Sequence, residues 1–243
     1  MQPVYAEKLA RELYRYLLRR SAVVFSDYMD MKSVFGRFNV PVVFVGEIVS
    51  CRKAIIGKIS GGYKFRSPQV DHLFVGVCVE KGVLELCDCL SKGKFKLKVV
   101  KDKFVLAGRP DAEFEVDGRV VPVEIKSSVS RSRCSRQHLL QAALYAYLYD
   151  SEFALLLFIG RRVKVYQVGN VLSDDDVLSL YDVWRSVYPM FRSECVNCYF
   201  RLSGKCRGFE ECGNVGDKRS VLFSICDRVV RSCCCFSFYQ LFS

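Results

Sequence analysis

The sequence lacks a long apolar run: with tyrosine counted as polar, the longest uninterrupted one extends from Phe153 to Ile159. A membrane-spanning helix needs about 20 consecutive apolar residues, so this pattern provides no such helix. Residues 1–20 are charged throughout and contain no apolar region of the kind that forms a secretory signal. We therefore expect neither membrane insertion nor secretion, and we expect a cytoplasmic protein.

Histidine is scarce, with only two residues in 243, and acidic residues are outnumbered by basic ones. Lys plus Arg total 37 against 26 Asp plus Glu, which gives a formal charge of +11. An excess of positive charge favours a polyanionic partner, of which nucleic acid is the commonest. The 51% hydrophobic content is typical of a globular protein. A chain of this length buries about 70% of its unfolded surface and needs no disulfides to form a core.

Cysteine, in contrast, is abundant. The 13 cysteines are odd in number, and three are consecutive, from Cys233 to Cys235. Without an export signal, this is a poor pattern for a disulfide framework. We interpret a subset of the thiols as ligands of a metal or cluster, and the others as small buried apolar residues.

The apolar periodicity predicts a mixed α/β domain, since short strands are framed by helices on both sides. Helices are expected over residues 4–20, 133–149 and 174–187. Strands are expected over residues 41–49, 95–100, 103–108, 111–116, 119–126, 152–159 and 162–168. The pattern between residues 74 and 90 fits either a helix or a strand, and the last fifty residues appear irregular, basic and rich in cysteine.

A hairpin turn is predicted at Asp117-Gly118, which stands between two alternating runs. A two-residue turn there places Asp111 directly opposite Glu124, and Lys126 on the same face. Directly opposed like charges are destabilising unless a cation lies between them. Mg²⁺ or Mn²⁺, which prefer oxygen ligands, would remove that repulsion, and Lys126 would then orient a water for attack on phosphorus. The alternative is a solvated acidic edge in which these charges have no function.

The residues Pro110-Asp111 and Glu124-x-Lys126 resemble the PD-(D/E)xK nuclease motif, and GRPDAEF with VEIKSS is similar to its RecB-like branch. This resemblance implies an α/β fold with a restriction-endonuclease-like core, a mixed sheet flanked by helices. It also implies that Asp111, Glu124 and Lys126 are catalytic, and that Asp111, Glu124 and Ile125 bind the metal.

The resemblance extends to residues 141–145, where Gln141 and Tyr145 match the Q-x-x-x-Y motif of the RecB-like branch. In that branch the helix packs beside the metal site and its polar pair approaches DNA, so Gln141 and Tyr145 are expected to bind DNA. The branch also uses an upstream histidine as a metal ligand. His72 is in the right order, although Glu80 or Glu47 would serve equally as an oxygen donor.

Four cysteines resemble the ligand set of the [4Fe–4S] nucleases related to AddB and the CRISPR-associated RecB-like exonucleases. One is N-terminal and three are C-terminal: Cys51, Cys195, Cys198 and Cys206. The resemblance implies an iron–sulfur lobe formed by the N- and C-terminal segments. Cys212 competes with Cys51 for the fourth place, and it would make a local four-cysteine site better suited to zinc.

The resemblance implies a lead-in over residues 1–50, a nuclease core over 51–190 and a cluster-binding segment over 191–212, whereas the tail over 213–243 resembles no known segment and its role is open. The implied activity is exonucleolytic cleavage of single-stranded DNA with Mg²⁺ or Mn²⁺, before CRISPR spacer integration. A CRISPR integrase would be the partner, and the setting would be a prokaryotic cytoplasm. Two alternatives remain: a structure-specific or restriction-type endonuclease, and a non-catalytic zinc-stabilised DNA-binding protein.

Overall fold

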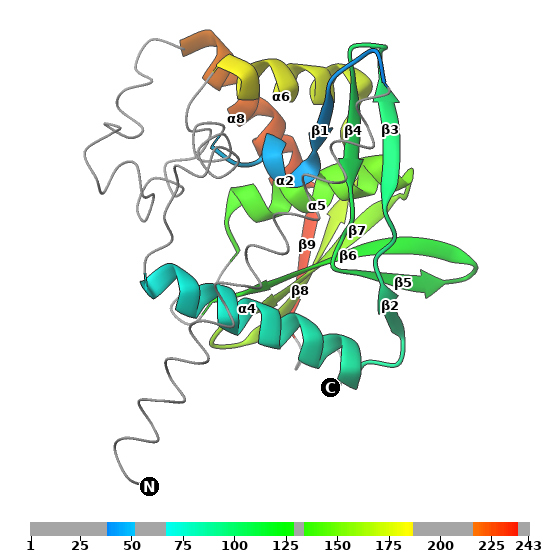
Figure 1. Cartoon of the computed structure of the whole chain (residues 1–243), viewed down its shortest axis with the longest axis vertical. Coiled ribbons are helices and arrows are strands. Elements are labelled where there is room, and N and C mark those ends of the chain that lie inside the picture. The colour runs from blue at the N-terminus through cyan, green and yellow to red at the C-terminus, as the bar shows by residue number, and fades with distance from the viewer. Residues whose placement is uncertain (1–37, 52–66, 129–133, 187–215, 238–243) are drawn as a thin grey trace, which may run out of the picture.

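The computed structural model describes residues 38–51, 67–128, 134–186 and 216–237 (Figure 1). The larger of its two sheets has the strand order β2-β5-β6-β7-β8-β9. These strands are Leu90–Lys92, Ala112–Val116, Arg119–Ser127, Phe153–Ile159, Val163–Gly169 and Cys233–Ser237. The smaller sheet has the order β1-β4-β3, with bounds Val42–Phe44, Phe104–Gly108 and Lys96–Val100. Both sheets are mixed, because β6 with β7 and β1 with β4 are parallel and the other pairs are antiparallel.

Helix α5 (Arg136–Tyr149) lies between the two sheets and contacts strands of both (Figure 1). It is apolar around most of its circumference, as expected of a helix with sheets on two sides. Helices α6 (Asp174–Ser186) and α8 (Gly216–Arg231) pack against each other, and α8 also packs against α5. The main core forms around α5 and includes Leu140, Leu144, Leu156 and Phe158.

Helix α4 (Ser67–Leu86) packs against the other face of the larger sheet at β6. Its Val79 and Val83 pack against a second, smaller apolar cluster formed by Ala112, Val123 and Ile125. Strand β6 is therefore covered on both faces, and every residue from 121 to 125 is buried. This double coverage takes Glu124 out of water.

Most predicted elements are confirmed, including α5, β7, β8, α6 and the hairpin of β5 with β6. The ambiguous stretch between residues 74 and 90 is mostly helical, since α4 ends at Leu86. The helix predicted over residues 4–20 lies outside the described residues. Among the described residues, no helix is both long enough and apolar enough to cross a membrane.

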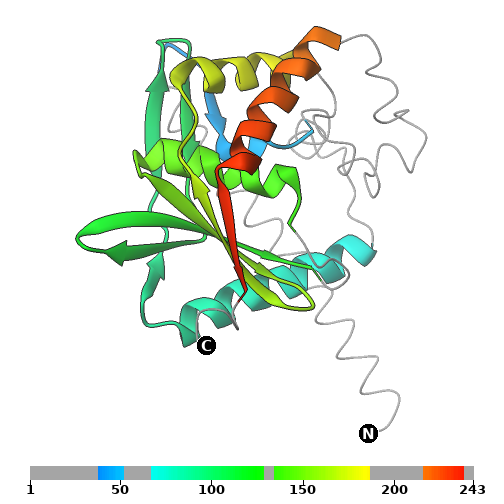
Figure 2. The ribbon, with the colours of Figure 1, turned by 180° about the vertical axis from the view of Figure 1, so that it is seen from behind.

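Two expectations are wrong. The strand expected over residues 41–49 ends at Phe44, where α2 (Val45–Ile48) begins, because Glu47 Oε2 accepts the Phe44 backbone N–H at 2.9 Å. The part of the last fifty residues that the structure describes, 216–237, is not irregular: α8 leads into β9 at the edge of the larger sheet (Figure 2). Val168 pairs with Cys233 and Tyr166 with Cys235, so the cysteine triplet forms strand structure.

Candidate active site

The predicted hairpin register is confirmed. Strand β5 pairs with β6 from Ala112 opposite Val123 to Val116 opposite Arg119. The turn between them has positive φ at both central residues, 50° at Asp117 and 72° at Gly118. Two-residue turns of this kind match the twist of the flanking strands. One residue beyond the last pair, the chain brings Asp111 to the Glu124 end of β6.

Asp111 is fixed against β6 by its side chain. Its Oδ2 accepts the backbone N–H of Ile125 at 2.7 Å. Burial raises the pKa of Asp111 above its usual value, although Lys126 and the hydrogen bond from Ile125 act in the opposite direction. One carboxylate oxygen is therefore held by the strand, and the carboxyl group lies in an environment that disfavours its charge.

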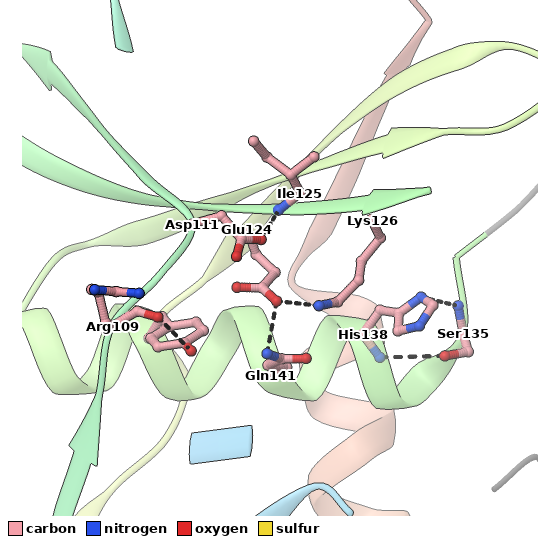
Figure 3. Close-up of polar contacts among 9 residues, drawn as sticks. Arg109, Asp111, Glu124, Ile125, Lys126, Ser135, His138 and Gln141 are labelled. Atoms are coloured by element: carbon pink, nitrogen blue, oxygen red, sulfur yellow. Dashed lines mark hydrogen bonds and ion pairs between the residues drawn. The ribbon is translucent and has the colours of Figure 1, made fainter. Parts of the chain in front are cut away.

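Glu124 is 2% exposed and forms two contacts through one oxygen (Figure 3). Its Oε1 pairs with Lys126 Nζ and accepts a hydrogen bond from Gln141 Nε2 at 2.7 Å. Its Oε2 is buried and has no hydrogen-bond partner among the described residues. Burying a carboxylate oxygen without a partner costs free energy, so we expect this atom to bind a ligand.

Burial raises the pKa of Glu124 to about 7, with Lys126 opposing the shift and Asp111 adding to it. Burial alone would lower the pKa of Lys126, but the negative charges of Glu124 and Asp111 outweigh it and the net shift is upward. Lys126 therefore stays an ammonium group. Its chemistry is to donate hydrogen bonds and to stabilise negative charge, and not to act as a base.

Helix α5 supplies the polar groups beneath the hairpin (Figure 3). Its start is set by Ser135, whose Oγ accepts the His138 N–H at 3.3 Å, while His138 Nδ1 accepts the Ser135 N–H at 3.4 Å. His138 thus has a capping role at the helix start. Tyr145, one turn beyond Gln141, is 6% exposed and donates its hydroxyl to the Arg109 carbonyl at 3.0 Å.

The Tyr145 contact gives this residue a role that the sequence did not indicate. Its hydroxyl points to the backbone just before Pro110-Asp111. Gln141 is half-buried and bound to Glu124. The Q-x-x-x-Y pair therefore contacts the backbone just before Asp111 and the side chain of Glu124, and its contact with DNA remains a prediction.

Glu80 on α4 is a further carboxylate near the site. Burial raises its pKa, and the charge of Asp111 raises it further, while Arg109 and Lys126 lower it. The adjacent Val79 packs against the apolar cluster under β6, which holds this part of α4 against the hairpin. Glu47, the other acidic alternative to His72, instead caps α2.

Several predicted residues fall outside what the structure describes. His72 lies in α4, but its side chain is not described. Four cysteines lie entirely outside the described residues: Cys195, Cys198, Cys206 and Cys212. Cys51 is buried just after α2. In the described part of the chain, no group of three or more His, Cys, Asp or Glu residues is arranged to hold a metal ion.

The chemistry of the carboxylate pair fits a hard divalent cation. Asp111 and Glu124 offer oxygen ligands, and Mg²⁺ and Mn²⁺ prefer these. The buried Glu124 Oε2 is the specific atom that lacks a partner among the described residues. Mg²⁺ usually takes only one or two protein carboxylates and keeps several waters, so a pair is sufficient.

No family model matches the chain, and no curated protein matches it. Among solved structures, the crystal structure of SSO0001 is similar, with a TM-score of 0.59 and 18% sequence identity. The match covers 80% of this chain and 95% of that chain. At this identity the likeness concerns the fold, a mixed α/β architecture with mixed sheets flanked by helices.

Proposed function

We propose that this protein is a metal-dependent deoxyribonuclease with a restriction-endonuclease-like core, and that it degrades single-stranded DNA from an end. One observation carries the proposal: the buried Glu124 has an unpartnered oxygen among the described residues, next to Asp111 and an ammonium group. Asp111, Glu124 and the Ile125 main-chain oxygen are the proposed metal ligands. A divalent cation bound there would act as a Lewis acid on a phosphate oxygen.

The remaining ligand comes from α4 in this proposal. His72 and Glu80 both belong to that helix, and the effect of the Asp111 charge on the Glu80 pKa supports Glu80. A third oxygen donor would add negative charge to the site and strengthen its preference for a hard cation.

The chain's own cations divide the remaining work. Lys126, held by Glu124, donates from Nζ to orient the attacking water and to stabilise charge on the phosphate. Arg109 is exposed and its charge acts on Asp111, and in this proposal its guanidinium binds a substrate phosphate. The Tyr145 hydroxyl donates to the Arg109 carbonyl and so holds the backbone of this residue in place.

An iron–sulfur cluster on Cys51, Cys195, Cys198 and Cys206 is part of the proposal, and it rests on the resemblance of the ligand spacing. Thiolate ligands suit a [4Fe–4S] cluster, which would cross-link the N- and C-terminal segments into a lobe. Gln137 on α5 donates to the Val49 carbonyl at 2.9 Å, which ties the backbone before Cys51 to the site helix. Trimming of DNA ends for a CRISPR integrase in a prokaryotic cytoplasm is the proposed setting.

The test is cleavage of linear and circular single-stranded DNA by the purified protein with Mn²⁺ and with EDTA. We expect loss of linear DNA only, and only with Mn²⁺. Cleavage of the circle would instead indicate an endonuclease. Salt-sensitive DNA binding without any cleavage, in a protein that contains zinc, would indicate the non-catalytic alternative.

A further inference from the structure

Helix α5 carries a stripe of polar side chains at intervals of four residues, which places them on one face. They are Gln137, Gln141, Tyr145 and Tyr149. The first three contact Val49, Glu124 and Arg109, as described above. The fourth, Tyr149, extends the stripe one turn beyond the Q-x-x-x-Y pair and reaches a part of the chain with no role in the proposed chemistry.

Tyr149 contacts Glu113 and the backbone of Lys94. Its hydroxyl lies 2.8 Å from Glu113 Oε1 and 2.5 Å from the Lys94 carbonyl oxygen. Glu113 is 4% exposed, and its Oε1 also accepts the Lys94 backbone N–H at 2.6 Å. A buried carboxylate needs such donors, so Glu113 and Tyr149 together fix the segment that joins β2 to β3.

The segment between β2 and β3 packs closely against the backbone of Pro110 and of Asp111, the proposed metal ligand. At Gly93 an added Cβ would lie 2.0 Å from the Pro110 carbonyl oxygen and 2.8 Å from its carbon, so only glycine fits. The Gly93 N–H donates to the Asp111 carbonyl at 3.4 Å. Gly93 therefore forms the surface against which Pro110-Asp111 rests.

We infer that Tyr149 and Glu113 are positioning residues for Asp111, acting through Lys94 and Gly93. Tyr145 holds the Arg109 carbonyl on one side of Asp111, and Gly93 holds the Pro110-Asp111 backbone on the other. The Asp111 side chain then reaches the Ile125 N–H with one oxygen and leaves the second for a cation. That these residues position Asp111 rests on the contacts alone. That this positioning matters for catalysis rests on the proposed function.

The test compares Tyr149→Phe with Tyr147→Phe. Tyr147 lies in the same last turn of α5 and also donates its hydroxyl to a carboxylate, Asp174 Oδ1 at 2.7 Å, but it contacts α6 and not the Asp111 segment. Both variants lose one hydroxyl–carboxylate contact, so a general structural role predicts similar behaviour. The measurements are residue-resolved hydrogen exchange at the Ile125 amide, Mn²⁺ binding, and kcat and KM on linear single-stranded DNA.

In Tyr149→Phe we expect the Ile125 amide to exchange about tenfold faster, because the Asp111 carboxylate that accepts it is less well held. We also expect Mn²⁺ to bind about tenfold more weakly, as for other residues that orient a metal ligand, and kcat to fall while KM is unchanged. Tyr147→Phe should match the wild type in all three. Equal exchange at Ile125 in the two variants would overturn the inference. If the exchange differs but the wild type neither binds Mn²⁺ nor cleaves DNA, the positioning contact stands and the proposed function fails.

Discussion

Gln141 Nε2 lies 2.7 Å from Glu124 Oε1, so a side chain of helix α5 donates a hydrogen bond to the buried carboxylate of strand β6. The same oxygen pairs with Lys126, which leaves Glu124 Oε2 as the atom available to a ligand. The helix thus determines which oxygen of the carboxylate faces the site. Because Oε2 can bind a cation only when the carboxyl group is ionised, we expect the protonation state of Glu124 to control cation binding.

Cation binding should depend on pH through Glu124. Its pKa is raised to about 7, mainly by burial, and a metal needs the ionised form. We expect Mn²⁺ affinity to rise as the pH increases through about 7 and to level off above it, as measured by isothermal titration calorimetry between pH 5.5 and 8.5. In Gln141→Met, which removes a donor to the carboxylate, the midpoint should move to higher pH. An affinity that is constant across this range would contradict the assignment.

The same ionisation should affect stability without metal. A carboxyl group whose pKa is raised from 4.5 to about 7 in the folded state has no effect below about pH 4.5, destabilises the fold increasingly between about pH 4.5 and 7, and has a constant effect above that. We therefore expect the free energy of unfolding in EDTA to fall from pH 5.5 to about 7 and to level off by pH 8.5, as measured by urea denaturation. The fall should be smaller in Glu124→Gln. Parallel curves for the two proteins would show that Glu124 ionises normally.

Glu80 should contribute to the metal site from α4. Its charge interacts with Asp111, so Glu80→Gln should weaken Mn²⁺ binding by about tenfold. Glu85→Gln is the matched control, because Glu85 belongs to the same helix and is exposed. His72→Ala tests the alternative ligand. If His72→Ala weakens binding and Glu80→Gln does not, the histidine of the family pattern is the ligand.

If the proposed iron–sulfur cluster is bound, the protein should be brown when it is purified without oxygen. Cys198→Ser should lose the broad visible absorbance and should unfold at a lower temperature, because ligation across so long a loop constrains the unfolded chain. A colourless wild type with stoichiometric zinc would exclude the cluster. If Cys51→Ser keeps both colour and stability, the local site with Cys212 replaces it.

The hairpin was predictable because its determinants are local. Asp117-Gly118 sets a two-residue turn, and the turn sets the register that brings Asp111 to the Glu124 end of β6. Helix α5 was equally predictable from its length. The burial of β6 on both faces was not predictable. The helix that covers its second face, α4, arises from a stretch whose apolar pattern fits either a helix or a strand. The raised pKa of Glu124 follows from that coverage and was therefore invisible in the sequence.

The supporting contacts around Asp111 depend on tertiary structure. Nothing local marks Glu113 as buried or Gly93 as lying against Pro110, since β2, β5 and α5 meet only in the fold. A signal for Tyr149 did exist, in the repeat of polar residues every four positions along α5. The C-terminal strand was missed because three consecutive cysteines give no alternation of apolar and polar residues, so the last fifty residues were expected to be irregular.

The most direct test of the central claim is cleavage of end-labelled linear single-stranded DNA with Mn²⁺ by the wild type and by Asp111→Asn. Asparagine keeps the shape of the side chain and an oxygen for the Ile125 N–H, but it removes the charge that the cation needs. Loss of several kcal/mol of transition-state stabilisation corresponds to a decrease in rate of about a thousandfold. The proposal predicts that decrease with a melting temperature that is not lowered, and cleavage by Asp111→Asn at the wild-type rate would contradict it.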